Sequence, residues 1–524
     1  MAMTVNRREA LRLGGMITVG VAVTAGVTWA TTGSADQSGQ LLDSDLKLPE
    51  RFTAKLPIPA VAKPRSTKDG VARYELTQRA SKVEIIPGKR TEIWGFDGTF
   101  PGPTFDVRSG RPITVSIANR LDVPTSTHLH GGVTPAKYDG FPTHVIVPPG
   151  SHFHPHDSMA MKMDMSVWKM YDGSFDHEYP LDQAATMLWY HDHRMDFTAP
   201  QVWRGLAGMF IVRDDVEDAL PLPKGDREIP LMLCDRAFRA DGSFKYPSVD
   251  GTLLGAPGVT GDYHEGVQGD VLLVNGAPWP TVDVDGARYR LRFLNASNAR
   301  RYDLSLEADG RTTPFVQIGS DIGLLGSPQE LDDLAIAPAE RYDVIVDFSK
   351  FKPGTEVTLV NKLGTGGTDA VMRFKVGDRA DDPSKIPDTL AKVEKLAPAK
   401  VAAGRTFHFA RTGTDSGQMW TINDKPYDPS GTIARVKAGT VERWSITSDL
   451  HHPVHVHLGH FQVTSRAGKP PEPRDAGWKD TVDMRAFETI EVLIRFPEVK
   501  GRYMIHCHNL EHEDMAMMAN FDVV

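Results

Sequence analysis

Cysteine is nearly absent from this sequence: its 524 residues include only Cys234 and Cys507. Cys507 lies in a His-Cys-His motif that suggests a free, metal-binding thiolate, so we expect no disulfide within the chain. Cys234 ends the mostly apolar run 229–234, which predicts a buried strand residue. A fold that depends on disulfides is therefore excluded.

Basic residues are also fewer than acidic ones. Lys and Arg number 59 against 68 Asp and Glu, which gives a formal net charge of -9. No strongly basic block occurs outside the extreme N-terminus, so we expect no nucleic-acid partner. Long helical periods are rare, whereas 47 Gly, 37 Pro and many short β-branched runs favour an all-β protein. A chain of this length should hold about three domains.

A long apolar run is missing as well, which bears on the N-terminus. Residues 14–30 are moderately apolar, but the stretch is short and rich in Gly, Thr and Ala, which argues against the alternative of a membrane anchor. The preceding Asn6-Arg7-Arg8 resembles a twin-arginine signal. We therefore predict that residues 1–35 are a twin-arginine-type signal peptide, recognised by the twin-arginine export machinery, and that the protein is periplasmic or extracellular.

Short strand patterns divide the rest of the chain into three parts. We predict a first β-sandwich domain at residues 36–215, which begins with a Pro-rich extended arm, and a second at 225–380. A linker rich in Pro, Lys and Ala at 381–403 leads to a third sandwich at 404–524. Residues 441–446 alternate between apolar and polar side chains, as half-buried strands do.

The most informative motif lies close to the C-terminus, where residues 503–508 read YMIHCH. In a strand, alternate side chains point to opposite faces, so His506 and His508 project to one side and Cys507 to the other. One short segment can therefore serve two metal sites. A thiolate, two imidazoles and a weak axial thioether form a blue-copper electron-transfer site, and Cys507, His512 and Met517 supply three of these four groups.

Three further His-x-His motifs occur at residues 128–130, 191–193 and 455–457. Residues i and i+2 of a strand lie about 6.6 Å apart on one face, a spacing that suits two imidazoles that reach neighbouring metal ions. A single pair would usually be an ordinary strand pattern, but four pairs, one of them enclosing a cysteine, predict a metal cluster. Zinc is the alternative, but a zinc site takes four ligands, whereas these four pairs together with His452 and His512 offer ten histidines and a thiolate.

With these four motifs in this order, residues 70–524 resemble the multicopper oxidases, and within them the bacterial laccase-like members: spore-coat laccases, phenoxazinone synthases, bilirubin oxidases and periplasmic cuprous oxidases. The resemblance implies three cupredoxin-like β-sandwich (Greek-key) domains and four copper ions. The implied ligands are His452, Cys507, His512 and Met517 for the type 1 copper, His128 and His455 for the type 2 copper, and His130, His191, His193, His457, His506 and His508 for the type 3 pair.

The same resemblance implies a laccase-like activity. The enzyme would take single electrons from phenols or aromatic amines at the type 1 copper and reduce dioxygen to water at the three-copper cluster. Glu513 and Asp139 would relay protons or set the electrostatics of the cluster. The residues themselves leave alternatives open, because Glu513 could merely orient an imidazole and Asp139 could be a turn residue before Gly140.

A methionine-rich stretch suggests two other hypotheses. Five methionines lie between residues 159 and 170: Met159, Met161, Met163, Met165 and Met170. Thioethers favour cuprous copper, so the enzyme could instead be a cuprous oxidase for copper tolerance, with cuprous ion as its reductant, while packing of an inserted loop is the alternative. Three upstream histidines, at residues 152, 154 and 156, would suit either a metal or a solvated strand face. A protein that is exported only to sequester copper is the non-enzymatic hypothesis.

Overall fold

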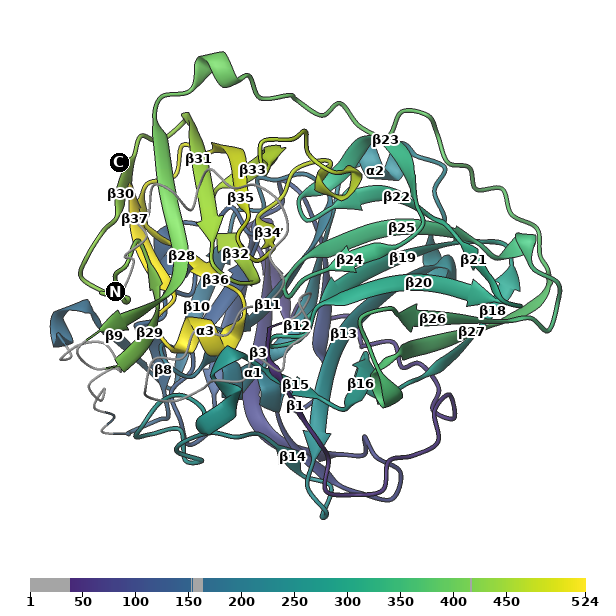
Figure 1. Ribbon diagram of the computed structural model, residues 1–524, viewed down its shortest axis with the longest axis horizontal. Coiled ribbons are helices and arrows are strands. Elements are labelled where there is room, and N and C mark those ends of the chain that lie inside the picture. The colour runs from purple at the N-terminus through teal and green to yellow at the C-terminus, as the bar shows by residue number, and fades with distance from the viewer. Residues whose placement is uncertain (1–37, 152, 154–163, 415–416) are drawn as a thin grey trace, which may run out of the picture. The chain divides into compact units, whose positions relative to one another are not determined.

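The computed structural model describes residues 38–151, 153, 164–414 and 417–524, and strands dominate it (Figure 1). The described α-helices are short: α1 (Thr198–Arg204), α2 (Asp215–Ala219) and α3 (Leu510–Asp514). Among the described residues, no helix has the length and apolar character needed to cross a membrane. The predicted signal peptide, the three upstream histidines and Met159, Met161 and Met163 lie outside the described residues.

The first sandwich contains two sheets around one apolar core. One sheet has the order β10-β6-β3-β2, with β4 beside β3, and the other has the order β5-β12-β11-β7. The strands are β2 (Ser66–Lys68), β3 (Val71–Val83), β4 (Thr91–Phe96), β5 (Gly102–Arg108), β6 (Ile113–Asn119), β7 (Thr127–His130), β10 (Ser174–Tyr179), β11 (Thr186–Asp192) and β12 (Ala207–Arg213), with a separate pair β8 (His144–Val147) and β9 (Lys169–Asp172). All side chains of β7 and β11 are buried, so these two strands lie inside the molecule.

The middle sandwich has the largest sheet, with the order β17-β16-β13-β19-β25-β22-β23, packed on a sheet with the order β18-β27-β26-β20-β21. Its strands are β13 (Glu228–Phe238), β14 (Phe244–Lys245), β16 (Val271–Val274), β17 (Ala277–Pro278), β18 (Thr281–Gly286), β19 (Arg288–Asn295), β20 (Tyr302–Ala308), β21 (Arg311–Thr313), β22 (Phe315–Ser320), β23 (Gly323–Leu331), β24 (Leu334–Ile336), β25 (Arg341–Asp347), β26 (Glu356–Asn361) and β27 (Ala370–Arg379). Cys234 is a buried residue of β13, as predicted.

The third sandwich combines sheets with the orders β29-β28-β31-β35-β33 and β30-β37-β36-β32-β34. Its strands are β28 (Gly404–Thr414), β29 (Gly417–Ile422), β30 (Ala434–Val436), β31 (Val441–Ser448), β32 (His452–Val456), β33 (His460–Arg466), β34 (Thr481–Met484), β35 (Thr489–Arg495), β36 (Gly501–Cys507) and β37 (Met518–Val523). Buried and part-exposed side chains alternate along β31, which confirms the predicted pattern. The all-β fold of three sandwiches is likewise confirmed, whereas the domain boundaries stay predictions.

The N-terminal arm is extended and packs against the middle sandwich. Its strand β1 (Gln40–Leu42) pairs in parallel with β15 (Val267–Gly269), and the N–H of Leu56 donates to the carbonyl of Thr281 (2.8 Å). Thr281 begins β18, the edge strand of its sheet, so the arm covers part of this edge.

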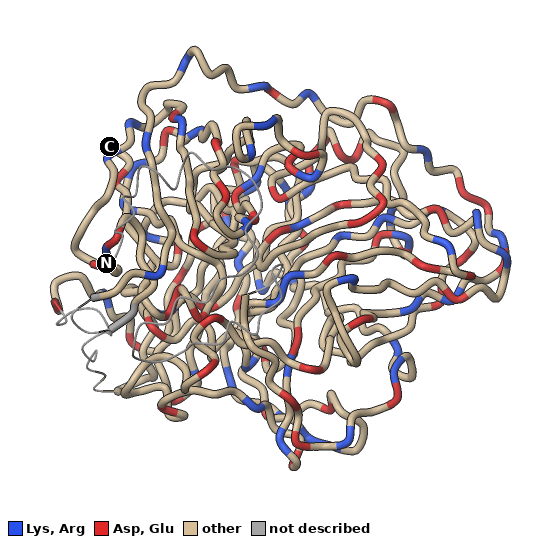
Figure 2. Tube along the Cα trace, in the orientation of Figure 1, with Lys and Arg blue, Asp and Glu red and all other residues tan. Residues whose placement is uncertain are grey.

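Acidic and basic residues are interspersed along the part of the chain that Figure 2 colours by charge.

Candidate metal centre

Strand β36 ends within the His-Cys-His motif, with His508 directly after it, and all three side chains are fully buried. Cys507 packs in the apolar core of the third sandwich. The ring centroid of His506 lies 4.9 Å from that of His193, and the ring centroid of His508 lies 5.2 Å from that of His191. The cysteine and the two histidines therefore serve different surroundings, as strand alternation predicts.

Cys507 forms a group with His452 and His512. The Nδ1 atoms of the two histidines are 3.1 Å apart and lie 3.5 and 3.6 Å from Cys507 Sγ. Atoms that bind one ion at about 2.0 Å for nitrogen and about 2.3 Å for sulfur are spaced in this way. Met517 is fully buried, and its carbonyl accepts a hydrogen bond from the N–H of Cys507 (3.1 Å). Three of the four predicted ligands therefore converge, and the backbone of the fourth, Met517, is hydrogen-bonded to that of Cys507.

The surroundings of Cys507 suit a thiolate only when a cation is present. Burial raises the pKa of its thiol well above the ordinary value, although the backbone N–H of Asn509 donates to Sγ (3.4 Å). A bound metal ion displaces the thiol proton and stabilises the thiolate. The donor set and its burial thus fit a metal ion.

Three residues that the sequence patterns did not indicate contact the two histidines of this site. Asp449 Oδ1 lies 3.0 Å from His452 Nε2, and the carbonyl of Glu265 lies 3.2 Å from His512 Nε2. The ring of Trp420 stacks on that of His512, with centroids 3.7 Å apart. Asp449 could have been suspected from its position three residues before a ligand, but no local pattern marks the other two.

Eight more histidines meet between the first and third sandwiches, and all are buried. They are His128, His130, His191 and His193 from the first sandwich and His455, His457, His506 and His508 from the third. Strand pairing aligns them, because His128 is opposite His191 across β7 and β11, and His455 is opposite His506 across β32 and β36. The structure therefore brings together every histidine of the four predicted motifs.

The eight histidines form three groups, two of which share His130, and in each group the ligand atoms lie within 4.8 Å of one another. These groups are His128 with His130 and His455, His130 with His191 and His508, and His193 with His457 and His506. Three ions could be held side by side, with imidazole nitrogens as their protein ligands.

In three of these rings, a backbone carbonyl contacts one nitrogen, and the other nitrogen is available to bind a metal ion. Backbone carbonyls contact Nδ1 of three rings: Asp139 with His128, Asp192 with His191, and Asp480 with His455, at 2.5, 2.7 and 2.9 Å. The Nε2 atoms of these rings have no hydrogen-bonding partner among the described residues. Metal-binding histidines show this arrangement, because the fixed nitrogen sets the tautomer and orients the ring.

Burial also keeps the rings neutral. It lowers the pKa of His128 to about 3 and holds the pKa values of His130, His191 and His455 well below the ordinary value. Neutral imidazole is the form that binds a metal ion. The cluster is therefore suited to cations at neutral pH.

Both predicted carboxylates touch this cluster. Asp139 Oδ2 lies 2.7 Å from His457 Nδ1. Glu513, in α3, reaches two rings, with Oε1 at 3.2 Å from His193 Nδ1 and Oε2 at 3.2 Å from His506 Nδ1. Burial raises the pKa of Asp139 to about 6, so this group can exchange a proton near neutral pH.

Comparison with known proteins agrees with this geometry. Two family models described as multicopper oxidase match the chain, one at residues 77–168 and 170–217 and the other at residues 402–524. The chain is 34% identical to a laccase from Bacillus subtilis (strain 168), over 90% of this chain and 98% of that protein.

Solved structures give the same result. A laccase from Pediococcus acidilactici has a TM-score of 0.78 and 31% identity, and the match covers 92% of this chain and 96% of that one. The laccase-like multicopper oxidase CueO from Ochrobactrum sp. has a TM-score of 0.74 and 29% identity, with 90% and 100% covered. The cupredoxin-like fold class is thereby confirmed. The chain belongs to the multicopper oxidase family, as a laccase-like copper oxidoreductase that uses dioxygen as its electron acceptor.

Proposed function

We propose that the protein binds four copper ions. His452, Cys507, His512 and Met517 hold the type 1 ion, His128 and His455 the type 2 ion, and the other six histidines of the cluster the type 3 pair. The observation that carries this proposal is that the buried candidate ligands gather into one group with a thiolate and three neighbouring groups of imidazoles, two of which share His130. A thiolate with two imidazoles suits copper, and imidazoles alone also suit it.

Bound copper supplies one-electron redox chemistry and activates dioxygen. The chain supplies the connection between the two kinds of site, because Cys507 is covalently continuous with His506 and His508. In addition, Nδ1 of His506 lies 3.0 Å from the carbonyl of Cys507. Electrons that arrive beside His452 and His512 therefore have a short route to the histidine cluster.

Reduction of dioxygen to water consumes one proton for every electron. Glu513 contacts His193 and His506, and Asp139 contacts His457, so each carboxylate adjoins ligands of the type 3 pair. In our proposal Glu513 delivers protons to this side of the cluster, and Asp139 holds a second proton there.

For the reducing substrate we propose phenols and aromatic amines. The related Ochrobactrum enzyme is described as active towards lignin model compounds, which are of this chemical class. Both histidines of the type 1 site are fully buried, but the Asp449 side chain, bonded to His452, is 26% exposed. A phenol could donate its hydroxyl proton to Asp449 while its electron passes by way of His452 to the type 1 site. Loss of the proton together with the electron would give a neutral phenoxyl radical and avoid a charged one.

Cuprous ion is the second candidate substrate. Met165 and Met170, at the end of the methionine-rich stretch, are 48% and 42% exposed. Soft thioethers of this kind favour cuprous copper. Replacement of Met159, Met161, Met163 and Met165 with Leu keeps apolar bulk and removes sulfur. Cuprous oxidation that falls more than phenol oxidation would favour this candidate, whereas parallel rates would leave the stretch as a packed loop.

The test is metal analysis of the purified protein combined with oxygen uptake. We expect four copper ions per chain, an intense blue absorption, and oxygen consumption with a phenol. Bound copper without oxygen consumption, whether phenol or cuprous ion is offered, would instead favour a sequestering protein. Zinc in the histidine cluster of the native protein would contradict the proposal.

We also propose export through the twin-arginine route, on the strength of Arg7 and Arg8 alone. This route carries folded proteins, which suits a protein that acquires its metal before export. Replacement of both arginines with Lys should leave the protein in the cytoplasm, because the signal requires the arginine pair. Unchanged export of that variant would refute the proposed route.

A further inference from the structure

The middle sandwich contains no metal-binding motif, yet one of its side chains reaches the edge of the histidine cluster. Arg341 is the first residue of β25 and its side chain is 1% exposed. The carboxylate that it meets belongs to Asp480, which directly precedes β34 in the third sandwich and is fully buried. Their contacts are Nη1 to Oδ1 at 2.7 Å and Nη2 to Oδ2 at 2.5 Å, which is a two-point, fork-like pair.

Every N–H of the Arg341 guanidinium is used. Besides Asp480, the acceptors are the carbonyls of Met187 for Nε, Ala339 for Nη1 and Asp321 for Nη2, at 3.1, 2.9 and 2.9 Å. Met187 belongs to the first sandwich, Ala339 and Asp321 to the middle one, and Asp480 to the third. Five donors in a rigid plane thus join three sandwiches at one point, which the three rotatable donors of Lys cannot reproduce.

Asp480 in turn fixes two of the histidines assigned to copper. Its Oδ1 lies 3.2 Å from His130 Nε2, and its carbonyl contacts His455 Nδ1 at 2.9 Å. The same Oδ1 accepts a hydrogen bond from the hydroxyl of Thr481 (2.8 Å), which is itself 3.1 Å from His130 Nε2. The nitrogen of His130 that remains without a partner among the described residues is Nδ1. Asp480 therefore determines which nitrogen of His130 faces the metal.

Close packing at Gly131 shows how tightly this arrangement is built. Gly131 follows the ligand His130 and has a φ of +83°, and a Cβ at this position would lie 2.5 Å from Asp480 Oδ2 and 2.9 Å from Arg341 Nη2. Only a residue without a side chain allows the ion pair to approach the ligand strand β7 so closely. The backbone of the ligand strand and the ion pair are thus in direct contact.

The arginine also stabilises the buried carboxylate of Asp480. The carboxylate of Asp480 is fully buried, and the two contacts with Arg341 place a positive charge directly against it. A buried carboxylate that loses this partner would have to move or admit water. Either change would release His130 and His455 from their present orientation.

We propose that Arg341 is a positioning residue of the three-copper site: the middle sandwich, through Arg341 and Asp480, sets the rings of His130 and His455 that bind the type 2 copper and its neighbour. This inference rests on the copper assignment proposed above. It gives the middle sandwich a part in dioxygen reduction although it contributes no ligand. The type 1 site lies outside this network, because none of the contacts of Arg341 or Asp480 involves its ligands.

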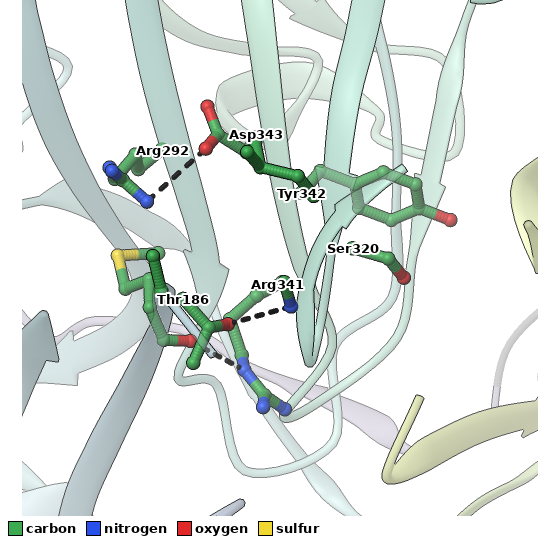
Figure 3. Close-up of a pocket in the computed structure, with 10 residues that line it drawn as sticks. Thr186, Arg292, Ser320, Arg341, Tyr342 and Asp343 are labelled. Carbon is green, nitrogen blue, oxygen red and sulfur yellow. Dashed lines mark hydrogen bonds and ion pairs between the residues drawn. The ribbon is translucent and has the colours of Figure 1, made fainter. Parts of the chain in front are cut away.

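A matched control lies in the same part of the molecule. Arg292 is as buried as Arg341 and lines the same small interior cavity, but it binds Glu217, Glu228 and Asp343 instead. Figure 3 shows the two arginines pointing apart, with Arg292 beside Asp343 and the side chain of Arg341 directed away from them. Loss of either arginine breaks a buried ion network. The two substitutions therefore disturb the same kind of interaction, but only Arg341 is linked to proposed copper ligands.

The test compares Arg341→Gln, Arg341→Lys and Arg292→Gln with the parent, all loaded with copper. We expect Arg341→Gln to weaken binding of the type 2 copper about 10- to 100-fold, the range typical of partners that orient a metal ligand. Its type 2 electron paramagnetic resonance signal should weaken or change shape, while the blue type 1 absorption persists. Arg341→Lys should resemble Arg341→Gln, because the fork and not the charge alone is required, and Arg292→Gln should retain the type 2 signal.

The two half-reactions, oxidation of the substrate and reduction of dioxygen, can be measured separately and give an independent test. Anaerobic bleaching of the blue band by a phenol should keep its rate in Arg341→Gln, whereas reoxidation of the reduced protein by dioxygen should slow about 10- to 100-fold. An unchanged type 2 signal and reoxidation rate in Arg341→Gln would overturn the inference, as would equal losses in Arg292→Gln. If Arg341→Gln does not fold, Asp480→Asn keeps the size of the side chain and must produce the same type 2 change. A parent protein that lacks a blue band and type 2 signal altogether would instead refute the copper assignment.

Discussion

Cys507 is the residue on which the type 1 assignment depends. Its Sγ lies 3.5 and 3.6 Å from the two histidines of the site, and it is the only cysteine near a histidine group among the described residues. Cys507→Ser should therefore abolish the blue absorption and reduce oxidase activity to background, because a hydroxyl does not replace the thiolate as a copper ligand. The variant should keep its fold, since Ser is of similar size.

Absorption spectroscopy and circular dichroism of the copper-loaded variant check this expectation. Met517→Leu is the control, because the axial thioether is a weak ligand that tunes the site, so most of the blue band should remain. A blue band in Cys507→Ser would refute the type 1 assignment. Complete loss of type 1 copper in Met517→Leu would show that the thioether is a main ligand rather than a weak one.

Substitution of Glu513 tests whether this single residue supplies protons to the histidine cluster. Its two carboxylate oxygens lie 3.2 Å from the Nδ1 atoms of His193 and His506, so it can either deliver protons or only orient these rings. Glu513→Gln keeps the size and one acceptor oxygen but cannot donate an acidic proton. We expect turnover to fall about 100-fold or more, within the range typical of general acid catalysis, with copper content unchanged.

Copper analysis beside steady-state oxygen uptake separates these two roles. A role in orientation alone predicts that Gln, which can still hydrogen-bond to one ring, preserves much of the rate. Oxygen uptake at the parental rate with full copper would therefore leave Glu513 as an orienting residue. A variant that loses copper and activity in parallel would also indicate that Glu513 orients the rings.

At the scale of elements, the turn after Asp139 depends on Gly140. Gly140 has a φ of +81°, and a Cβ there would lie 2.5 Å from the Cα of His128 in β7. Gly140→Ala should therefore push apart the turn and the ligand strand, at a cost of about 1–3 kcal/mol beyond the conformational strain. Asp139 would move with the turn, so the thermal midpoint and the copper content should both fall.

Gly88→Ala is the matched control for this prediction. Gly88 has a φ of +74°, but nothing lies within 4 Å of a Cβ at this position. It carries the strain of a left-handed conformation, about 1–2 kcal/mol, without the clash. Equal thermal midpoints in the two variants would show that the turn relaxes freely and that its packing on β7 is unimportant.

Strands and ligand motifs are the elements that sequence patterns predict well. Alternation along β31 and the His-x-His pairs within β7 and at the ends of β11, β32 and β36 are local, because extended backbone alone decides which side chains share a face. Trp420, Glu265 and Asp449 could not be found in this way. Each reaches the type 1 site from a different segment of the chain, and isolated contacts of this kind leave no period in the sequence.

For the molecule as a whole, the number of sandwiches was predictable but their junctions were not. Composition and the spacing of short strands indicate three sandwiches, since each needs its own apolar core. The meeting of Met187, Arg341 and Asp480 depends on three chain segments that lie far apart in the sequence. An arginine at the start of an ordinary strand carries no sign of such a role.

The junction between the first and middle sandwiches contains a second buried ion network, which should make stability depend on acid. Glu228 accepts from Arg213 Nη1 and Arg292 Nε, each at 2.6 Å. Burial alone would raise the pKa of Glu228, but the neighbouring guanidinium groups lower it from 4.5 to about 2. Because the folded-state pKa is lowered, the stabilisation is complete above about pH 4.5 and is lost as the pH falls towards 2.

Glu228→Gln should therefore lower the free energy of unfolding at pH 7 by about 3 kcal/mol, since one pKa unit corresponds to about 1.4 kcal/mol. The difference between variant and parent should shrink as the pH falls from 5 to 2, where the parental carboxylate becomes protonated. Urea unfolding at a series of pH values measures this difference, and loss of copper in acid affects both proteins and cancels. Glu75→Gln is the control: the side chain of Glu75 is 68% exposed and 3.9 Å from Arg65, so water screens this pair and its loss should change the free energy of unfolding very little. A difference for Glu228→Gln that stays constant between pH 7 and pH 2 would mean that the pair contributes through packing and not through the charge of the carboxylate.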